Sequence, residues 1–180
     1  MSVVAFDLLG TLFDLGRLRE RMPRVLHHAA ALTLAGEWAP FDEVVESCDP
    51  ALAQKLQELE PYDDAREALS LCEEAWVLTN GTRKATEQLL ERTVLRALVA
   101  KVHTVEDVRK YKPHPDVYAL LPKDATLVAA HAWDVAGARA AGYRAVWVDR
   151  DESDWPLPLP EAELRAPTLI DAVQLTKDRP

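Results

Sequence analysis

The sequence contains little cysteine, no long apolar run and no excess of basic residues. Its two cysteines, Cys48 and Cys72, show neither metal-ligand nor redox-motif spacing, so we expect free thiols in a reducing compartment. No apolar run approaches the roughly 18 residues of a membrane span, and the first residues lack the basic start of a signal peptide. We therefore expect a cytoplasmic protein with no membrane partner.

The charge balance excludes another class of partner. The formal net charge is -9 and the isoelectric point is about 5.0. Nucleic-acid binding requires clustered lysine and arginine, because the phosphate backbone dominates the affinity. We expect no nucleic-acid partner.

What the chain does contain is enough apolar residues for one folded domain. Of its 180 residues, 48% are hydrophobic and 28% charged, which is typical of a globular domain that carries at most a small insertion. Four short apolar segments, at 3–6, 75–78, 126–130 and 144–148, have the composition of buried parallel strands. Helical patterns at 63–73, 82–98 and 134–141 alternate with them, and Gly142 fits the end of the last helix. This alternation predicts a doubly wound α/β sheet.

The stretch from 13 to 61 has a different pattern. It contains no predicted strand, and its helical runs lie at 15–34, with an interruption at Pro23, at 41–47 and at 51–59. We interpret it as a helical insertion that covers the end of the first strand. The proline-rich, acidic stretch 149–167 is predicted to be irregular and on the surface.

Asp7 closes the first predicted strand, where open α/β sheets place reactive groups. A carboxylate can act as a nucleophile when a cation and hydrogen-bond donors hold it ionised and oriented. The alternative is an aspartate that only caps a turn or helix. Thr11 follows Gly10, and its hydroxyl can point back towards the carboxylate. Leu9 cannot transfer a proton, so a nucleophilic Asp7 requires a leaving group that departs without an acid.

Thr79 and Asn80 end the second predicted strand and open a helix. A hydroxyl and an amide beside the free N–H groups of a helix start form an anion pocket. The alternative is simple helix capping by Thr79 or Thr82.

Three further residues stand at element boundaries. Lys112 precedes Pro113 and is held out of helical geometry, from which it can reach a carboxylate, although most lysines are solvated surface residues. His131 can be a general base, a substrate donor or a packed polar residue. Asp134 can cap its helix, bond to Lys112, or do both. His114 is interpreted as a helix-start residue.

The order Asp, Thr, Lys, Asp resembles the haloacid dehalogenase (HAD) superfamily over nearly all of the α/β portion. Within it, the chain is most similar to the L-specific (type II) 2-haloacid dehalogenases. The chain departs from that family at Leu9, where the family has Tyr, and at Ala129-Ala130-His131, where it has Ser-Ser-Asn. The matching runs are Phe6-Asp7 with Gly10-Thr11-Leu12-Phe13-Asp14, Asn80-Gly81, Tyr111-Lys112-Pro113 with Tyr118, and Ala132-Trp133-Asp134 with Gly137-Ala138-Arg139.

The resemblance implies a Rossmann-like parallel sheet with helices on both faces and a small helical cap inserted after the first strand. The core domain would comprise 1–12 and 62–180, and the cap 13–61. It implies a hydrolase in which Asp7 displaces halide from a short 2-halocarboxylic acid and forms an ester, with no cofactor and with homodimerisation through the cap. The implied catalytic residues are Asp7, Lys112, Asp134 and His131. The implied substrate-binding residues are Thr11, Thr79, Asn80, Tyr118 and Arg24, with Arg17, Arg19 and Arg21 as competitors of Arg24 for the halide.

Two alternatives stay open at this point. The first is a phosphatase of small phosphate esters that holds Mg²⁺ near Asp7 and Asp134. Leu9 argues against it, because the superfamily's phosphatases carry a second Asp at that place. The second alternative is an inactive relative whose shortened cap binds a partner.

Overall fold

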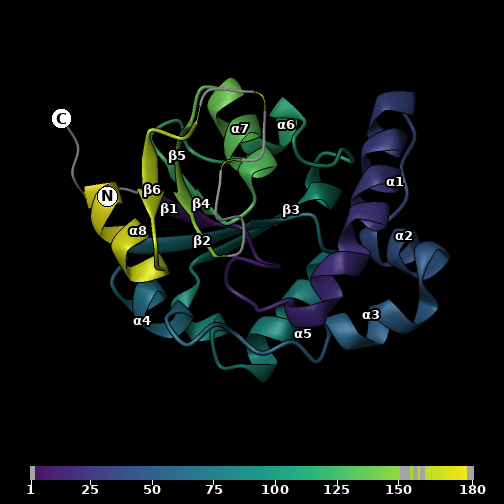
Figure 1. The fold of residues 1–180 in the computed structure, drawn as a ribbon, viewed down its shortest axis with the longest axis horizontal. Helices are drawn as coiled ribbons and strands as arrows, with labels where there is room; N and C mark the ends of the chain where they lie inside the picture. The colour runs from purple at the N-terminus through teal and green to yellow at the C-terminus, as the bar shows by residue number, and fades with distance from the viewer. Residues whose placement is uncertain (1–2, 151–154, 156–157, 159–160, 178–180) are drawn as a thin grey trace.

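The computed structural model describes residues 3–150, 155, 158 and 161–177. Its centre is a six-stranded sheet in which every neighbouring pair is parallel (Figure 1). The strand order is β3-β2-β1-β4-β5-β6. The strands are β1 Val3–Phe6, β2 Glu74–Thr79, β3 Lys101–Thr104, β4 Thr126–Ala129, β5 Arg144–Val148 and β6 Leu164–Ala166. The predicted α/β fold is confirmed.

Two strands lie where the sequence predicted none. Strand β3 was not expected, and β6 falls inside the stretch 149–167 that was predicted to be irregular. That prediction is wrong for 164–166; within the same stretch, residues 151–154, 156–157 and 159–160 lie outside the described part of the chain. Both unexpected strands are the edges of the sheet.

Helices cover both faces of the sheet. Helices α6 (Pro115–Tyr118) and α7 (Ala132–Ala140) lie above it in Figure 1, and α4 (Ala65–Ser70), α5 (Arg83–Arg92) and α8 (Leu169–Lys177) lie below. Two short 3₁₀ turns, η2 (Arg96–Leu98) and η3 (Val105–Asp107), flank β3. His114 is the N-cap of α6, and its side chain accepts a hydrogen bond from the Asp116 amide, as expected.

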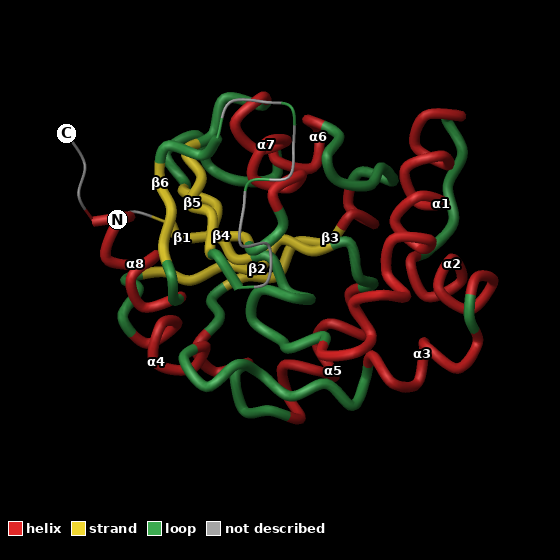
Figure 2. Tube along the Cα trace, in the orientation of Figure 1, coloured by secondary structure: helices red, strands yellow, loops and turns green. Residues whose placement is uncertain are grey.

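The segment after β1 is helical, and Figure 2 shows its helices grouped to one side of the sheet. It consists of η1 (Gly16–Arg21), α1 (Met22–Ala35), α2 (Phe41–Cys48) and α3 (Pro50–Leu56). Pro23 does not interrupt a long helix. It lies in the first turn of α1, where a missing N–H costs no hydrogen bond, and thereby fixes where that helix begins.

The position of β1 determines where a site can form. It pairs with β2 on one side and β4 on the other, so the chain leaves the sheet centre in opposite directions at this point. Ligands of open α/β sheets bind at such a switch point, outside the carboxyl ends of the strands. All four residues of β1 are buried and apolar, because helices cover both faces of a parallel sheet.

Tyr111 and Asp42 tie the inserted helices to this edge of the sheet. The Tyr111 hydroxyl donates to the Ala39 carbonyl at 2.7 Å, and its ring stacks on Trp38 with centroids 5.1 Å apart. The Thr82 hydroxyl donates to Asp42 Oδ2 at 2.8 Å. The insertion is therefore docked directly beside Lys112. Within the described residues, no helix combines the length and apolar character needed to cross a membrane.

Candidate active site

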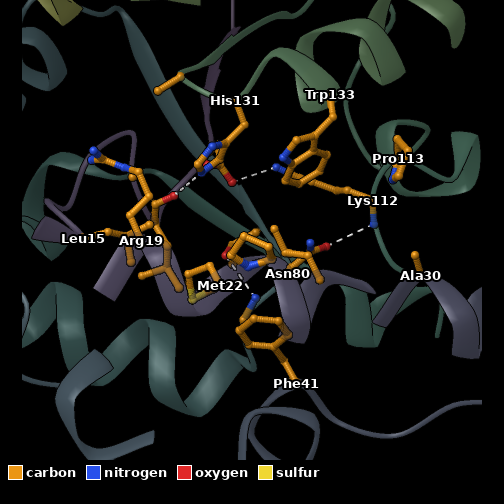
Figure 3. A pocket seen from close by; sticks show the side chains of 18 residues that line it. Leu15, Arg19, Met22, Ala30, Phe41, Asn80, Lys112, Pro113, His131 and Trp133 are labelled. Carbon is orange, nitrogen blue, oxygen red and sulfur yellow. Dashed lines mark hydrogen bonds and ion pairs between the residues drawn. The ribbon is translucent and has the colours of Figure 1, made fainter. Parts of the chain in front are cut away.

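A cavity of about 440 Å³ lies between the carboxyl ends of the strands and the inserted helices (Figure 3). In that view His131 and Trp133 lie on its upper side, and Met22 and Phe41 on its lower side. Its polar lining comes mainly from strand ends and the Lys112 loop, with Arg19 from the insertion, and both sides contribute apolar residues. The lining residues are Asp7, Leu9, Gly10, Leu15, Arg19, Met22, Pro23, Leu26, Ala30, Phe41, Thr79, Asn80, Gly81, Lys112, Pro113, Ala130, His131 and Trp133.

Asp7 presents its carboxylate to this cavity with both oxygens held. Lys112 Nζ lies 3.0 Å from Oδ1, and the Thr11 hydroxyl donates to Oδ2 at 3.0 Å. The same Thr11 oxygen accepts the Ala130 N–H at 3.0 Å, which fixes the hydroxyl's direction. Only 9% of the Asp7 side chain is exposed. Charge-assisted hydrogen bonds of this kind keep a carboxylate ionised and oriented, as a nucleophile needs.

Lys112 is a buried ammonium shared by two carboxylates. Its Nζ lies 2.7 Å from Asp134 Oδ2 as well as 3.0 Å from Asp7 Oδ1, and its side chain is fully buried. Burial by itself lowers the pKa of Lys112, but Asp134 and Asp7 outweigh that effect and raise it above 10.5. The lysine is therefore charged across the physiological range, and the predicted contact with Asp134 is present.

Asp134 is enclosed rather than open to the cavity. Its side chain is fully buried; Oδ2 binds Lys112, and Oδ1 accepts the Tyr118 hydroxyl at 2.7 Å. Burial raises the pKa of Asp134 even though Lys112 opposes the shift. Burial and the neighbouring Asp134 also raise the pKa of Tyr118, so this hydroxyl stays a donor. Asp134 therefore positions Lys112, and it is not among the residues that line the cavity.

Two residues expected to bind substrate instead hold catalytic groups. Thr11 is fully buried against Asp7, and Tyr118 is fully buried against Asp134; neither lines the cavity. In the structure each hydroxyl donates to a carboxylate of the protein, Thr11 to Asp7 and Tyr118 to Asp134.

Thr79 and Asn80 line the cavity. The Thr79 oxygen accepts the Gly81 N–H at 3.1 Å, which leaves the hydroxyl proton to donate. Asn80 Oδ1 accepts the Lys112 backbone N–H at 3.0 Å, which leaves its NH₂ group as a donor. Thr82 caps α5, accepting from the Ala85 N–H. The residue that caps the helix is therefore Thr82 and not Thr79.

His131 lines the cavity and is held by the loop that carries Asp7. Its Nε2 lies 2.9 Å from the Leu9 carbonyl oxygen, and its ring stacks on Trp133. A carbonyl only accepts hydrogen bonds, so Nε2 carries a proton and Nδ1 is the basic nitrogen of the neutral ring. Gly10 has a φ of +84°, and a Cβ there would lie 2.8 Å from His131 Nε2, so this turn requires glycine.

The arginine at the cavity is Arg19, whereas Arg24 is exposed and does not line it. This placement favours Arg19 over Arg24 as the arginine that faces a ligand. The α1 residues that line the cavity are Met22, Pro23, Leu26 and Ala30, whereas Arg24 is on the exposed side of the helix. The Arg19 guanidinium donates to the Tyr62 hydroxyl at 3.3 Å and lies 3.9 Å from Asp14.

Gly137 of α7 also shapes the site, in a way that its sequence pattern does not indicate. A Cβ at this position would lie 2.5 Å from both Pro113 Cβ and the Tyr118 hydroxyl. Glycine therefore lets α7 pack against the loop of Lys112. Its place one turn after Asp134 is visible in the sequence, but this close approach is not.

The residues of the site do not fit a magnesium ion. Both Asp134 oxygens are occupied by the Lys112 ammonium and the Tyr118 hydroxyl, which are donors. In the part of the chain that the structure describes, no group of three or more His, Cys, Asp or Glu side chains could hold a metal. Magnesium prefers several oxygen ligands.

Two bacterial dehalogenases are similar to this chain in sequence over most of its length. The chain is 25% identical to haloacetate dehalogenase H-2 of Moraxella sp. (strain B), covering 83% of this chain and 86% of that protein. It is 26% identical to an (S)-2-haloacid dehalogenase of Pseudomonas fluorescens, covering 81% and 83% respectively.

The fold has solved counterparts as well. The structure of L-2-haloacid dehalogenase from Xanthobacter autotrophicus superimposes with a TM-score of 0.89 at 22% identity, over 100% of both chains. Residues 39–148 match the family described as haloacid dehalogenase-like hydrolase, and this range runs from the insertion through Thr79, Lys112 and Asp134 to β5. With its parallel sheet, its aspartate after β1 and this match, the chain belongs to the haloacid dehalogenase-like hydrolases.

Proposed function

We propose that this chain is a 2-haloacid dehalogenase, which hydrolyses a carbon–halogen bond through an ester formed on Asp7. The observation that carries the proposal is the combination of a cavity-facing Asp7, paired with Lys112, and Leu9 two residues later. Halide departs as a stable anion, so its release needs no neighbouring acid. An alkoxide leaving group would need one.

In the first step, an Asp7 oxygen attacks carbon 2 of the substrate from the side opposite the halogen. The new C–O bond forms as the carbon–halogen bond breaks, and the electron pair leaves with the halide. Lys112 and Thr11 hold the carboxylate for this attack. The Thr79 hydroxyl and Asn80 amide donate to the substrate carboxylate, and Arg19 stabilises the halide.

In the second step, water attacks the ester carbonyl carbon of Asp7. We assign the base to His131, because it lines the cavity with Nδ1 available as an acceptor, whereas Asp134 is enclosed. His131 takes a proton from water and returns it to the departing alkoxide. The products are a 2-hydroxy acid, halide and one proton, and Asp7 is regenerated as a carboxylate.

The comparisons support this reading. The relatives named above are dehalogenases of haloacetate or of (S)-2-haloacids. A structural neighbour, the L-2-haloacid dehalogenase from Xanthobacter autotrophicus, has been solved with chloropropionic acid covalently bound, at a TM-score of 0.84.

The test is halide release from each enantiomer of 2-chloropropionate by the pure protein. We expect turnover of one enantiomer that persists in a metal chelator and is abolished in Asp7→Asn. The exposed Asp63→Asn variant serves as the matched control and retains wild-type activity. Hydrolysis of phosphate esters that requires Mg²⁺, without halide release, would replace this proposal by the phosphatase reading. No turnover of either substrate class would favour the inactive binding protein.

Three features of the organisation belong to the same proposal. Residues 13–61 act as a cap over the core formed by 1–12 and 62–180, and two copies associate through the cap, as the family resemblance implies. The protein is cytoplasmic, which its free Cys48 and Cys72 favour. Light scattering of the purified chain tests the dimer; a monomer mass at micromolar concentration would contradict it.

A further inference from the structure

One helix supplies a continuous apolar stripe to the cavity. Met22, Leu26 and Ala30 of α1 all line it, and residues four apart lie on the same helix face. We call these three residues the α1 stripe. From Met22 to Ala30 the stripe extends about 12 Å, at 1.5 Å per residue. Leu15 and Phe41 line the cavity from neighbouring parts of the insertion.

The groups assigned to the attack and to the substrate carboxylate lie on the sheet side of the cavity, whereas Arg19 of η1, assigned to the halide, comes from the insertion. Asp7, Thr79, Asn80 and Lys112 come from strand ends and the Lys112 loop. A haloacid of two or three carbons would be bound by these groups and would leave the half-buried Leu26 and Ala30 of the α1 stripe uncovered, whereas Met22 is already buried by the protein. The cavity volume of about 440 Å³ lies within the range of about 300–1,000 Å³ typical of sites for much larger ligands. Apolar surface left facing solvent beside a reactive site is typical of a binding surface for an apolar group.

We propose that the α1 stripe binds the hydrocarbon chain of the substrate, so that the preferred substrates are 2-haloalkanoic acids of medium chain length. This inference rests on the proposed function, since the carboxylate and halogen are placed by the groups assigned above. Ala30 sets the length of chain that fits. It is the smallest residue of the stripe, and Figure 3 shows it on its helix at the right-hand side of the cavity.

The first experiment measures kcat/KM for halide release along the series chloroacetate, 2-chlorobutanoate, 2-chlorohexanoate and 2-chlorooctanoate. Each buried methylene is expected to raise kcat/KM about threefold to fourfold until the stripe is filled. A value that stays flat or falls from chloroacetate onwards overturns the inference and leaves the dehalogenase proposal intact. This series uses the wild-type protein, so it does not depend on the folding of a variant.

A matched pair of variants tests the stripe itself. Ala30→Leu fills the cavity end of α1, whereas Ala31→Leu adds the same side chain at the next position, which is exposed. We expect the ratio of kcat/KM for 2-chlorooctanoate over 2-chlorobutanoate to fall at least tenfold in Ala30→Leu and to match the wild-type ratio in Ala31→Leu. Equal ratios in both variants would contradict the assignment of the stripe.

A binding experiment separates this inference from the proposed function. Propanoate and octanoate have no leaving group, so their calorimetric dissociation constants report the chain-binding surface alone. We expect octanoate to bind at least tenfold more tightly. If no haloacid releases halide but octanoate still binds more tightly, the proposed chemistry fails and the chain-binding surface stands. Equal affinities would overturn the inference whatever the chemistry.

Discussion

Arg19 and Arg24 lie five residues apart on the insertion, and only Arg19 reaches the cavity. A charged hydrogen bond is worth about 1.5–3 kcal/mol, which corresponds to a factor of about 10–150. If Arg19 binds the departing halide, Arg19→Ala should lower kcat/KM for a 2-chloroacid by that factor, while Arg24→Ala stays within about twofold. Steady-state halide release measures both variants. A larger loss in Arg24→Ala would show that Arg24, and not Arg19, binds the departing halide.

His131 is assigned to the second chemical step only. In His131→Gln, attack by Asp7 should proceed while hydrolysis of the ester slows by about 10²–10⁴-fold, the usual contribution of general base catalysis. Rapid-quench measurement should therefore show a burst of one halide per active site, followed by slow turnover. A linear time course at wild-type rate would rule out His131 as the base.

At the scale of elements, α7 packs closely against the Lys112 loop, and this packing holds the buried Lys112 and Asp134 side chains together. Alanine normally stabilises a helix relative to glycine by about 0.5–1 kcal/mol, but at Gly137 the new Cβ would lie 2.5 Å from Pro113 Cβ and the Tyr118 hydroxyl. We expect Gly137→Ala to lower the free energy of unfolding by about 1–3 kcal/mol, the usual cost of overpacking. Urea denaturation tests this prediction. A gain in stability would show that the loop adjusts freely.

The place of each strand in the sheet explains which strands the sequence predicted and which it did not. The four predicted strands are the central ones, whose covered faces produce continuous apolar runs. Strands β3 and β6 are edges, and they contain Lys101 and Arg165, the charged residues that edge strands carry. Neither edge strand is a continuous apolar run, and both are therefore absent from the predicted strands.

The sequence predicts the parts of the site that depend only on where a residue stands relative to the end of a strand. Asp7, Thr79, Asn80 and His131 follow strands whose ends must meet, and the sequence therefore brings them together. The roles of Arg19, Tyr118 and Gly137 depend on helix phase and on distances of a few ångströms between distant segments. These quantities are fixed by packing and leave no pattern in a single sequence.

At the scale of the whole molecule, several buried groups make the fold sensitive to alkaline pH. The pKa values of Tyr118 and Tyr111 are raised above 10.0 by burial, and that of Lys112 is raised above 10.5 because its two carboxylates outweigh its burial. The folded state keeps these protons after the unfolded state has lost them, so the free energy of unfolding falls as pH rises beyond about 10.

Each group contributes a slope of up to about 1.4 kcal/mol per pH unit. Urea denaturation at pH 8, 10 and 11 should therefore show constant stability from pH 8 to just below 10 and a steep loss above it. Tyr118→Phe should reduce that slope. Stability unchanged at pH 11 would contradict the described burial of these groups.

The central claim, that Asp7 is a covalent nucleophile, is tested most directly by a single turnover in H₂¹⁸O. With enzyme in excess over a 2-chloroacid, the oxygen transferred to the product comes from Asp7, and water replaces it in the carboxylate. Mass spectrometry of the peptide containing Asp7 should show ¹⁸O in that residue, and the 2-hydroxy acid should remain unlabelled. Label in the 2-hydroxy acid with none in Asp7 would mean direct attack by water and would contradict the mechanism.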